Sequence, residues 1–192
     1  MHFAWRGWIL AVLFAALAGV RWRSQQPLEP WGLALIAVGA LYRLYAGRYI
    51  PGHSNAVRLA GPDLALGGPY RFGRHPLYLS NLAVIAGLIL FANCLSLPAA
   101  ALFLAAACAH HALLARTEER YLASIRGEAY LGYMRVTSRW FGLPRVPAAG
   151  PSASLPASRP GGMALSWARQ GPNLGKSAAC AFILWFLASA HR

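Results

Sequence analysis

Charged residues are scarce in this sequence, and acidic residues are the scarcest. Only 12% of the 192 residues are Asp, Glu, Lys or Arg, and five of these are acidic, whereas a soluble domain is usually about 25% charged. Between Arg74 and Arg116 there is no Asp, Glu, Lys or Arg at all. Roughly 20 apolar residues in a helix cross a bilayer once, so the 39 residues from 77 to 115 are long enough for two passes. The composition excludes an ordinary soluble domain and predicts an integral membrane protein.

Cysteine motifs are also absent. Cys94, Cys108 and Cys180 stand alone in apolar sequence without a Cys-x-x-Cys pattern, which excludes the cysteine spacing of zinc and redox sites. We expect three small buried hydrophobic residues instead. Adjacent His110 and His111 point about 100° apart on a helix, which disfavours joint metal ligation. We therefore predict no metal site.

Positive charge is plentiful, because 17 Arg and one Lys give the chain a net charge of +13. In a soluble protein this balance would suggest nucleic-acid binding. Here the arginines lie between apolar runs, which favours cationic loops held at the cytoplasmic face of a membrane. With a cytoplasmic N-terminus and five spans, 15 basic residues fall on the cytoplasmic side and three on the other. We therefore expect the lipid bilayer as a partner, and no nucleic acid.

Five apolar runs alternate with the basic segments and predict an all-α fold. They cover residues 8–20, 31–46, 77–91, 97–115 and 178–190. The last run has 13 residues, a length that fits either a spanning helix or one that lies in the membrane interface. The predicted fold is a polytopic transmembrane helical bundle with four to five spanning helices.

Composition divides the chain into three parts. Residues 1–145 are predicted to form the membrane-embedded domain. Residues 146–162 are rich in Pro, Ala, Gly and Ser, which is typical of a flexible linker. Residues 163–192 form a C-terminal tail with the fifth apolar run. Within this tail, Gly-Pro-Asn-Leu-Gly-Lys-Ser at 171–177 resembles a phosphate-binding loop, but the spacing is one residue short and no strand precedes it, so we reject that function.

Two polar stretches, residues 47–75 and 116–139, fall on the same side of the membrane in this topology and can build one site. The first leads into Gly-Pro-Tyr-Arg-Phe-Gly-Arg-His-Pro-Leu-Tyr. Pro76 suits the first turn of a helix, where its missing N–H costs nothing. Arg74 and His75 then lie at headgroup depth, where an interfacial anchor and a ligand site are equally compatible with the spacing.

Glu118 and Glu119 are two of the five acids, and they follow the fourth apolar run closely. A solvated helix end would pair them with Arg116 and Arg120, and exposed pairs of this kind stabilise a protein by about 0–1 kcal/mol. The competing interpretation is a charged pocket that includes the arginines of the first polar stretch. Carboxylates and guanidinium groups together suit a zwitterionic or sulfonium-bearing ligand.

In combination these motifs resemble the isoprenylcysteine carboxyl methyltransferase and phospholipid methyltransferase superfamily over residues 68–144. The matching pieces are the Arg-His-Pro segment, the uncharged hairpin, the glutamate pair, and Gly-Glu-Ala-Tyr-Leu-Gly-Tyr at 127–133. The chain departs from the pattern at Arg126, where an aromatic residue usually stands, and in the tail after Pro144. The resemblance implies S-adenosylmethionine as the cofactor, bound at the cytoplasmic side in a pocket that a cytoplasmic helix over 116–135 completes.

The resemblance also assigns roles to residues. The expected catalytic residues are Arg74, His75 and Glu118. The expected cofactor-binding residues are Tyr70, Arg74, His75, Tyr78, Glu118, Glu119, Tyr130 and Tyr133. Because a sulfonium methyl group is already activated, the enzyme needs no nucleophilic side chain, and alignment of the reactants can supply roughly 7–11 kcal/mol of the barrier.

The expected function is therefore S-adenosylmethionine-dependent methylation of a lipophilic or lipid-linked acceptor at the cytoplasmic membrane face, as in isoprenylcysteine carboxyl methyltransferases. A phospholipid amine N-methyltransferase is one alternative. Another is a membrane NADPH-dependent reductase of the steroid-reductase type, which would carry Asn where this chain has Leu77. A third is a non-catalytic membrane scaffold that kept the pocket.

Overall fold

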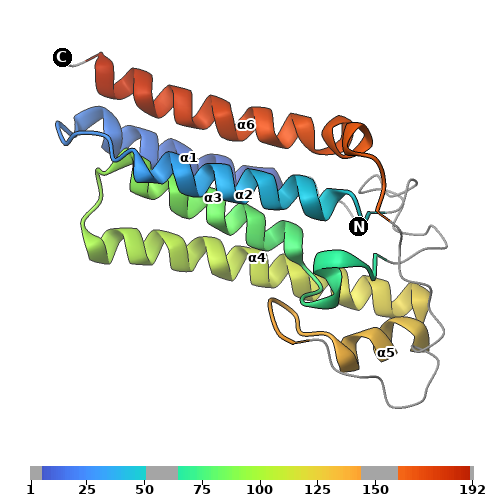
Figure 1. Cartoon of the computed structure of the whole chain (residues 1–192). Helices are drawn as coiled ribbons and strands as arrows, with labels where there is room; N and C mark the ends of the chain where they lie inside the picture. The colour runs from blue at the N-terminus through green and yellow to red at the C-terminus, as the bar shows by residue number, and fades with distance from the viewer. Residues whose placement is uncertain (1–5, 51–64, 144–159, 191–192) are drawn as a thin grey trace. The chain divides into compact units, whose positions relative to one another are not determined.

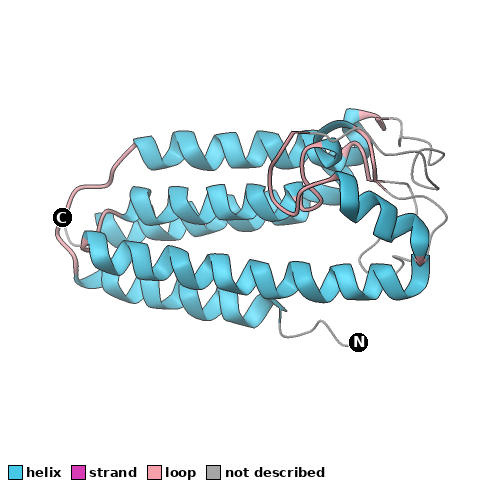
Figure 2. Ribbon diagram, turned by 90° about the horizontal axis from the view of Figure 1, so that it is seen from below, coloured by secondary structure: helices cyan, strands magenta, loops and turns pink. Residues whose placement is uncertain are grey.

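The computed structural model describes residues 6–50, 65–143 and 160–190, and the regular elements in them are all helical (Figures 1 and 2). They are α1 (Arg6–Arg23), α2 (Trp31–Gly47), the 3₁₀ helix η1 (Gly68–Arg71), α3 (Pro76–Ala92), α4 (Leu97–Arg126), α5 (Glu128–Val136) and α6 (Met163–Ser189). The predicted all-α class is confirmed. Most of the predicted linker, residues 146–159, and residues 51–64 of the first polar stretch lie outside the described residues.

The sequence misplaced one helix boundary that matters for the site. We expected an apolar helix to end at residue 115 and a separate polar helix to cover 116–135, but α4 continues through the change in polarity to Arg126. The break comes at Gly127, whose φ of +53° is a backbone conformation that glycine adopts readily and other residues rarely. A change of surrounding solvent does not interrupt a helix, whereas a residue in this conformation does.

The C-terminal helix is also longer than predicted. We expected a helix only over 178–190, whereas α6 has 27 residues and includes Pro172 in its interior. The expectation covered only the apolar run, and α6 continues through Pro172 although proline removes a helical hydrogen bond. Residues 171–177 lie inside α6, which confirms that they are not a phosphate-binding loop.

The described residues fall into two compact units. The first unit comprises residues 6–41, 80–114 and 171–190. Its core is apolar and draws on α1, α2, α3 and α6, with Leu17, Ile36, Val84, Leu88 and Leu184 among its buried members. The fifth apolar run therefore contributes directly to the core of this unit.

Close packing of α2 against α3 in this unit depends on glycine. A Cβ atom at Gly32 would lie 2.3 Å from the backbone nitrogen of Phe91. One at Gly39 would lie 2.9 Å from the carbonyl oxygen of Ser80. Small residues that let helix backbones approach closely are typical of helix contacts inside membranes.

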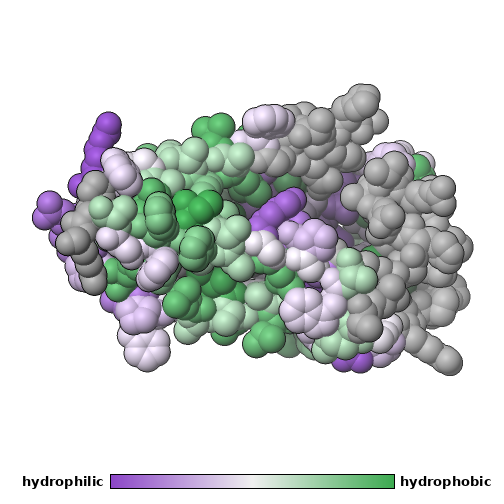
Figure 3. Space-filling view, turned by 90° about the horizontal axis from the view of Figure 1, so that it is seen from above, coloured by the Kyte–Doolittle hydropathy of each residue, from purple (hydrophilic) through white to green (hydrophobic). Residues whose placement is uncertain are grey.

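The first unit also carries large apolar side chains on its surface. Trp8, Val38, Leu102 and Phe182 are examples from four helices, each more than half exposed, and hydrophobic residues occupy much of the coloured surface in Figure 3. Because apolar faces point outward as well as inward, our expectation of three buried cysteines is wrong: Cys108 is exposed and the other two are partly buried.

Among the described helices, α4 is long and apolar enough by length and composition to cross a membrane, while α2 and α3 are shorter apolar helices of 17 residues each.

Candidate functional site

The second unit, residues 42–79 and 115–170 of the chain where described, contains the segments that the sequence singled out. The segment before α3 turns through η1, where the N–H groups of Phe72 and Gly73 both donate to the carbonyl oxygen of Pro69. Pro76 then begins α3, as predicted. The carbonyl oxygen of His75 accepts from the N–H of Tyr78 at 3.0 Å, so His75 is fixed at the start of the helix.

The loop after α5 is fastened to this segment by backbone hydrogen bonds. The N–H of Arg74 donates to the carbonyl oxygen of Ser138 at 3.0 Å, and the N–H of Gly142 donates to that of Phe72 at 2.8 Å. The rings of Phe72 and Phe141 stack with centroids 6.4 Å apart. Two segments far apart in the chain thus form one platform.

Gly73 is required for this contact. A Cβ atom there would lie 1.9 Å from the carbonyl oxygen of Trp140, a separation that no side chain can accommodate. The indole of Trp140 in turn lies 6.1 Å from the ring of His75, centroid to centroid. The Gly-Arg-His-Pro motif therefore needs glycine at its first position so that the loop at Trp140 can pack against it.

The Glu119 carboxylate lies at the centre of the site. Its Oε1 accepts from Nε and Nη2 of Arg74 at 3.0 and 2.9 Å. Nε of Arg139 lies 3.1 Å from both carboxylate oxygens, and Nη2 donates to Oε2 at 2.7 Å. Nε2 of His75 lies 3.2 Å from Oε1. The Glu119 side chain is only 4% exposed, so a buried acid is surrounded by three nitrogen-bearing side chains.

These contacts determine the charge of Glu119. Burial raises the pKa of its carboxyl group, but hydrogen bonds from His75, Arg139 and Arg74 outweigh burial and hold the pKa well below its usual range. The hydrogen bond between Arg139 and Glu119 raises the pKa of the Arg139 guanidinium group. An ionised carboxylate can only accept hydrogen bonds, so the contact with His75 places a proton on Nε2.

Arg74 also fixes the end of α5. Its Nη1 donates to the carbonyl oxygen of Met134 at 3.1 Å and to that of Thr137. The side chain is 8% exposed, and all three guanidinium nitrogens donate to protein groups. In this structure Arg74 therefore joins Glu119 to the backbone of the following segment.

Glu118 points to different partners. The hydroxyl of Tyr78 donates to its Oε2 at 2.7 Å, and Nδ1 of His75 lies 3.8 Å from the same oxygen. The Tyr78 ring stacks on His75 with a centroid distance of 5.2 Å and an interplanar angle of 11°. The Glu118 side chain is 22% exposed, so it keeps more accessible surface than its neighbour.

The predicted tyrosines Tyr70, Tyr130 and Tyr133 form a buried group in the same unit. The hydroxyl of Tyr133 donates to the carbonyl oxygen of Tyr70 at 2.7 Å, which ties α5 to η1. Burial raises the pKa of all three phenols, so they remain protonated at neutral pH. The bond between Tyr133 and Tyr70 is thus a structural contact within this unit.

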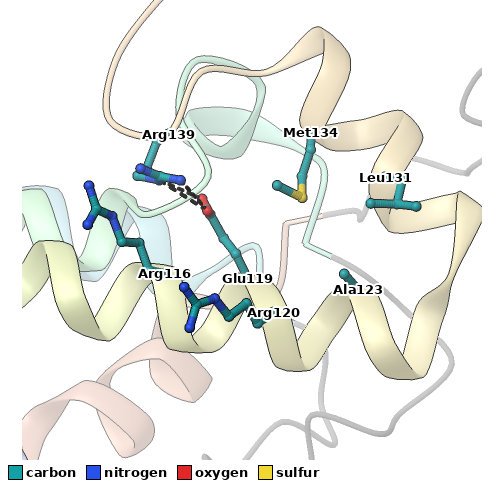
Figure 4. A pocket seen from close by; sticks show the side chains of 7 residues that line it. All are labelled: Arg116, Glu119, Arg120, Ala123, Leu131, Met134 and Arg139. Atoms are coloured by element: carbon teal, nitrogen blue, oxygen red, sulfur yellow. Dashed lines mark hydrogen bonds and ion pairs between the residues drawn. The ribbon is translucent and has the colours of Figure 1, made fainter.

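A pocket of about 360 Å³ lies beside Glu119 (Figure 4). It is lined by Arg116, Glu119, Arg120, Ala123, Leu131, Met134 and Arg139. The four residues from α4 recur at intervals of three, one and three, which places them on one face of the helix. Leu131 and Met134 point from α5 toward α4, and Arg139 reaches Glu119 from the following loop. Three arginines and one acid make the lining cationic.

The structure thus joins five of the eight predicted site residues in one hydrogen-bonded and stacked cluster, namely Arg74, His75, Tyr78, Glu118 and Glu119. Only Glu119 of the eight lines the pocket. Sequence reasoning missed Arg116, Arg120 and Arg139 as pocket residues. The first two share a helix face with Glu119 and were recognisable from spacing, whereas Arg139 approaches through a loop contact that no local pattern signals.

Within the part of the chain that the structure describes, no three His, Cys, Asp or Glu side chains are placed to hold a metal ion.

Comparison with known proteins gives two matches. The sequence model of the phospholipid methyltransferase family matches residues 28–129, just over half of the chain. The chain is also 35% identical over 141 residues to the cobalt-zinc-cadmium resistance protein CzcN of Cupriavidus metallidurans, a match that covers 71% of this chain and 61% of CzcN. The chain therefore spans less than two thirds of that relative. No solved structure matches it.

Proposed function

This chain belongs to the phospholipid methyltransferase family, and from that premise we propose that it transfers a methyl group from S-adenosylmethionine to a lipophilic or lipid-linked acceptor. Family members are S-adenosylmethionine-dependent methyltransferases, and membership indicates a lipid-type acceptor. The observation that supports the proposal most strongly is the ionised Glu119 in the wall of a cationic, partly apolar pocket.

The lining of the pocket fits the chemical groups of this cofactor. S-adenosylmethionine carries a carboxylate, and Arg116 and Arg120 would hold it through charge-assisted hydrogen bonds. Its adenine has apolar faces, which Leu131 and Met134 would cover. The volume of about 360 Å³ lies near the lower end of the range of about 300–1,000 Å³ for small-molecule sites.

The two glutamates have different parts in this proposal. The oxygens of Glu119 already accept from Arg74, His75 and Arg139, so Glu119 supports the site mainly by holding these groups. Glu118 is more exposed and lies outside the pocket lining, beside Tyr78 and His75. It would accept hydrogen bonds from the ammonium group or ribose hydroxyls of a cofactor that extends from the pocket toward His75. A cationic ligand group beside a carboxylate gains a charge-assisted hydrogen bond, which is stronger than a neutral one.

The cofactor supplies a methyl group that its sulfonium has already activated. The protein contributes alignment, exclusion of water and, for some acceptors, removal of a proton. Because Glu119 holds the proton on Nε2 of His75, Nδ1 is the nitrogen that would accept a proton from an amine acceptor. Glu118, 3.8 Å from Nδ1, would stabilise the resulting imidazolium. A carboxylate acceptor has no proton to lose and would not need this step.

That difference separates the two acceptor classes, a carboxyl group on an isoprenoid-like molecule and an amine headgroup of a phospholipid. Replacing His75 with Gln removes the proton acceptor but keeps a hydrogen-bond donor toward Glu119. We expect amine methylation to fall by about 100-fold or more, as for the loss of a general base, and carboxylate methylation to change little. Assays with both acceptor types, at saturating cofactor, identify the class.

We place the active site at the cytoplasmic face of a multi-pass membrane protein. The exposed apolar side chains of the first unit support contact with lipid, because soluble monomers rarely expose large contiguous apolar surfaces. The basic residues, 15 against three, support the orientation. Four to five helices would span, with α4 as the best candidate.

Two exposed serines test this topology, Ser96 before α4 and Ser124 near its end. In a variant without the native cysteines, each is replaced by Cys and labelled in intact cells with a membrane-impermeant maleimide. Ser96→Cys should be labelled, and Ser124→Cys should be labelled only after the cells are opened. The reverse pattern would contradict the proposed orientation.

Equilibrium binding tests the cofactor. Calorimetry on the full chain in detergent should detect S-adenosylmethionine and S-adenosylhomocysteine, and Glu118→Gln should weaken both by roughly 10- to 150-fold, the effect of losing a charge-assisted hydrogen bond. NADPH should not bind. Tight binding of NADPH without binding of either adenosyl compound would refute the methyltransferase proposal and favour the reductase alternative.

A further inference from the structure

Arg139 lies beyond the residues that the family model matches, since the match ends at residue 129. It is nevertheless the side chain that covers the pocket side of the central acid. Its own side chain is 34% exposed, while that of Glu119 is 4% exposed. The site therefore depends on a segment beyond the residues that the family model matches.

The two oxygens of Glu119 have different partners. Arg74 and His75 both donate to Oε1. Arg139 supplies the closest contact to Oε2, at 2.7 Å from Nη2, and its Nε is equidistant from both oxygens at 3.1 Å. Arg139 is thus the group that fixes the rotation of the carboxylate about its last bond.

The loop that carries Arg139 is positioned independently of this ion pair. Ser138 and Gly142, on either side of it, are hydrogen-bonded to Arg74 and Phe72 through the backbone. The guanidinium group is therefore delivered by a platform that also holds Arg74. Loss of the Arg139 side chain leaves that platform with its backbone bonds intact.

We propose that Arg139 is a positioning residue for the proposed methyl transfer. It holds Oε2 of Glu119, so that the carboxylate keeps the side chains of Arg74 and His75 and the wall of the pocket in their positions. This inference rests on the proposed function. Without Arg139, Oε2 loses its hydrogen-bonded partner while Oε1 keeps Arg74 and His75, so the carboxylate is free to turn toward the pocket. Ligand binding then weakens although Arg139 itself need not touch the ligand.

The ionisation of Glu119 gives this role a distinct signature. The groups that face its carboxylate or share its pocket are Arg74, His75, Tyr130, Arg139, Arg116, Arg120 and the adjacent Glu118. Removing Arg139 takes away one of the hydrogen bonds that hold the pKa of Glu119 below its usual range. The carboxyl group then becomes protonated at a higher pH, and binding that needs the carboxylate is lost at a higher pH on acidification.

The test measures S-adenosylhomocysteine binding to the full chain in lipid nanodiscs as a function of pH. Arg139→Gln should bind S-adenosylhomocysteine at least about 10-fold more weakly at pH 7. The acid limb of its binding curve, the pH range over which acidification abolishes binding, should move to higher pH. Arg139→Lys, which keeps the charge, should recover part of the affinity. The matched control is Arg135→Gln, because Arg135 forms an exposed pair with Glu128 at 3.6 Å, and it should change binding by no more than about a few-fold.

A second measurement guards against a variant that merely folds poorly. Binding to Arg139→Ala should be restored in part by millimolar methylguanidinium, and binding to Arg135→Ala should not respond. The inference is overturned if Arg139→Gln binds like Arg135→Gln, or if its acid limb does not move and methylguanidinium has no effect. If the wild-type chain itself fails to bind S-adenosylhomocysteine, the proposed function fails, which is a separate result.

Discussion

Replacing Glu119 with Gln should destabilise the protein far more than the loss of any other acid that the structure describes. The substitution keeps the size of the side chain but removes the charge that Arg74, Arg139 and His75 surround. Arg74 is 8% exposed, so it would be left as a buried cation without an anionic partner. Breaking a buried pair in this way typically costs about 3–5 kcal/mol.

Glu128→Gln is the matched control for this prediction. Glu128 pairs with Arg135 at 3.6 Å, and the two side chains are 68% and 71% exposed. A pair this exposed is screened by water, so its loss should cost no more than about 1 kcal/mol. The two substitutions change the same chemical group, on α4 and on α5, and differ mainly in burial.

The assay is unfolding of the purified chain in mixed micelles of increasing SDS content, followed by tryptophan fluorescence. It should also show a pH effect. Because the pKa of Glu119 is lowered in the folded state, its contribution is fully present above the unfolded value of about 4.3 and declines as the pH falls below it. Glu119→Gln should remove that part of the acid sensitivity. A free energy of unfolding within about 1 kcal/mol of the wild type, as for an exposed pair, would refute the assignment of Glu119 as the centre of the site.

Two further substitutions test the packing on which the site depends. Tyr133→Phe removes the buried hydrogen bond to the carbonyl oxygen of Tyr70 and should cost about 1–3 kcal/mol in the same unfolding assay, because a buried acceptor is left unsatisfied. Gly32→Ala should destabilise the first unit by about 1–3 kcal/mol through overpacking, since its Cβ would meet the backbone at 2.3 Å. Gly175→Ala, which meets nothing within 4 Å, should be neutral or stabilise by up to about 1 kcal/mol through helix propensity.

The helices that the sequence located well are those whose ends coincide with a change in backbone preference. Pro76 starts α3, as its fixed φ and missing N–H predict, and α2 begins at the predicted Trp31. The boundary expected at residue 115 failed because polarity changes there without any residue that breaks a helix. The start expected for α6 followed the apolar run alone, whereas the helix begins at Met163 and continues through Pro172.

The candidate site was predictable where residues are close in the chain, and not where they are distant. The pair Glu118 and Glu119 was recognisable as unusual from the sequence. The sequence did not predict that the two side chains have separate partners, Tyr78 and Arg139. A 100° step per residue predicts divergence on a helix, while the partners depend on which loops dock there. The contact between the carbonyl of Trp140 and Gly73 is of this kind, and no local sequence pattern in either segment predicts it.

The most direct test of the account is transfer of a labelled methyl group. Vesicles that contain the full chain are incubated with methyl-tritiated S-adenosylmethionine and a bacterial lipid extract, then partitioned between organic solvent and water. If the protein methylates a lipophilic acceptor, label should appear in the organic phase, should depend on the protein and should be strongly reduced in Glu118→Gln. Label that stays in the aqueous phase with wild-type protein, although S-adenosylmethionine binds, would contradict methyl transfer to a lipophilic acceptor.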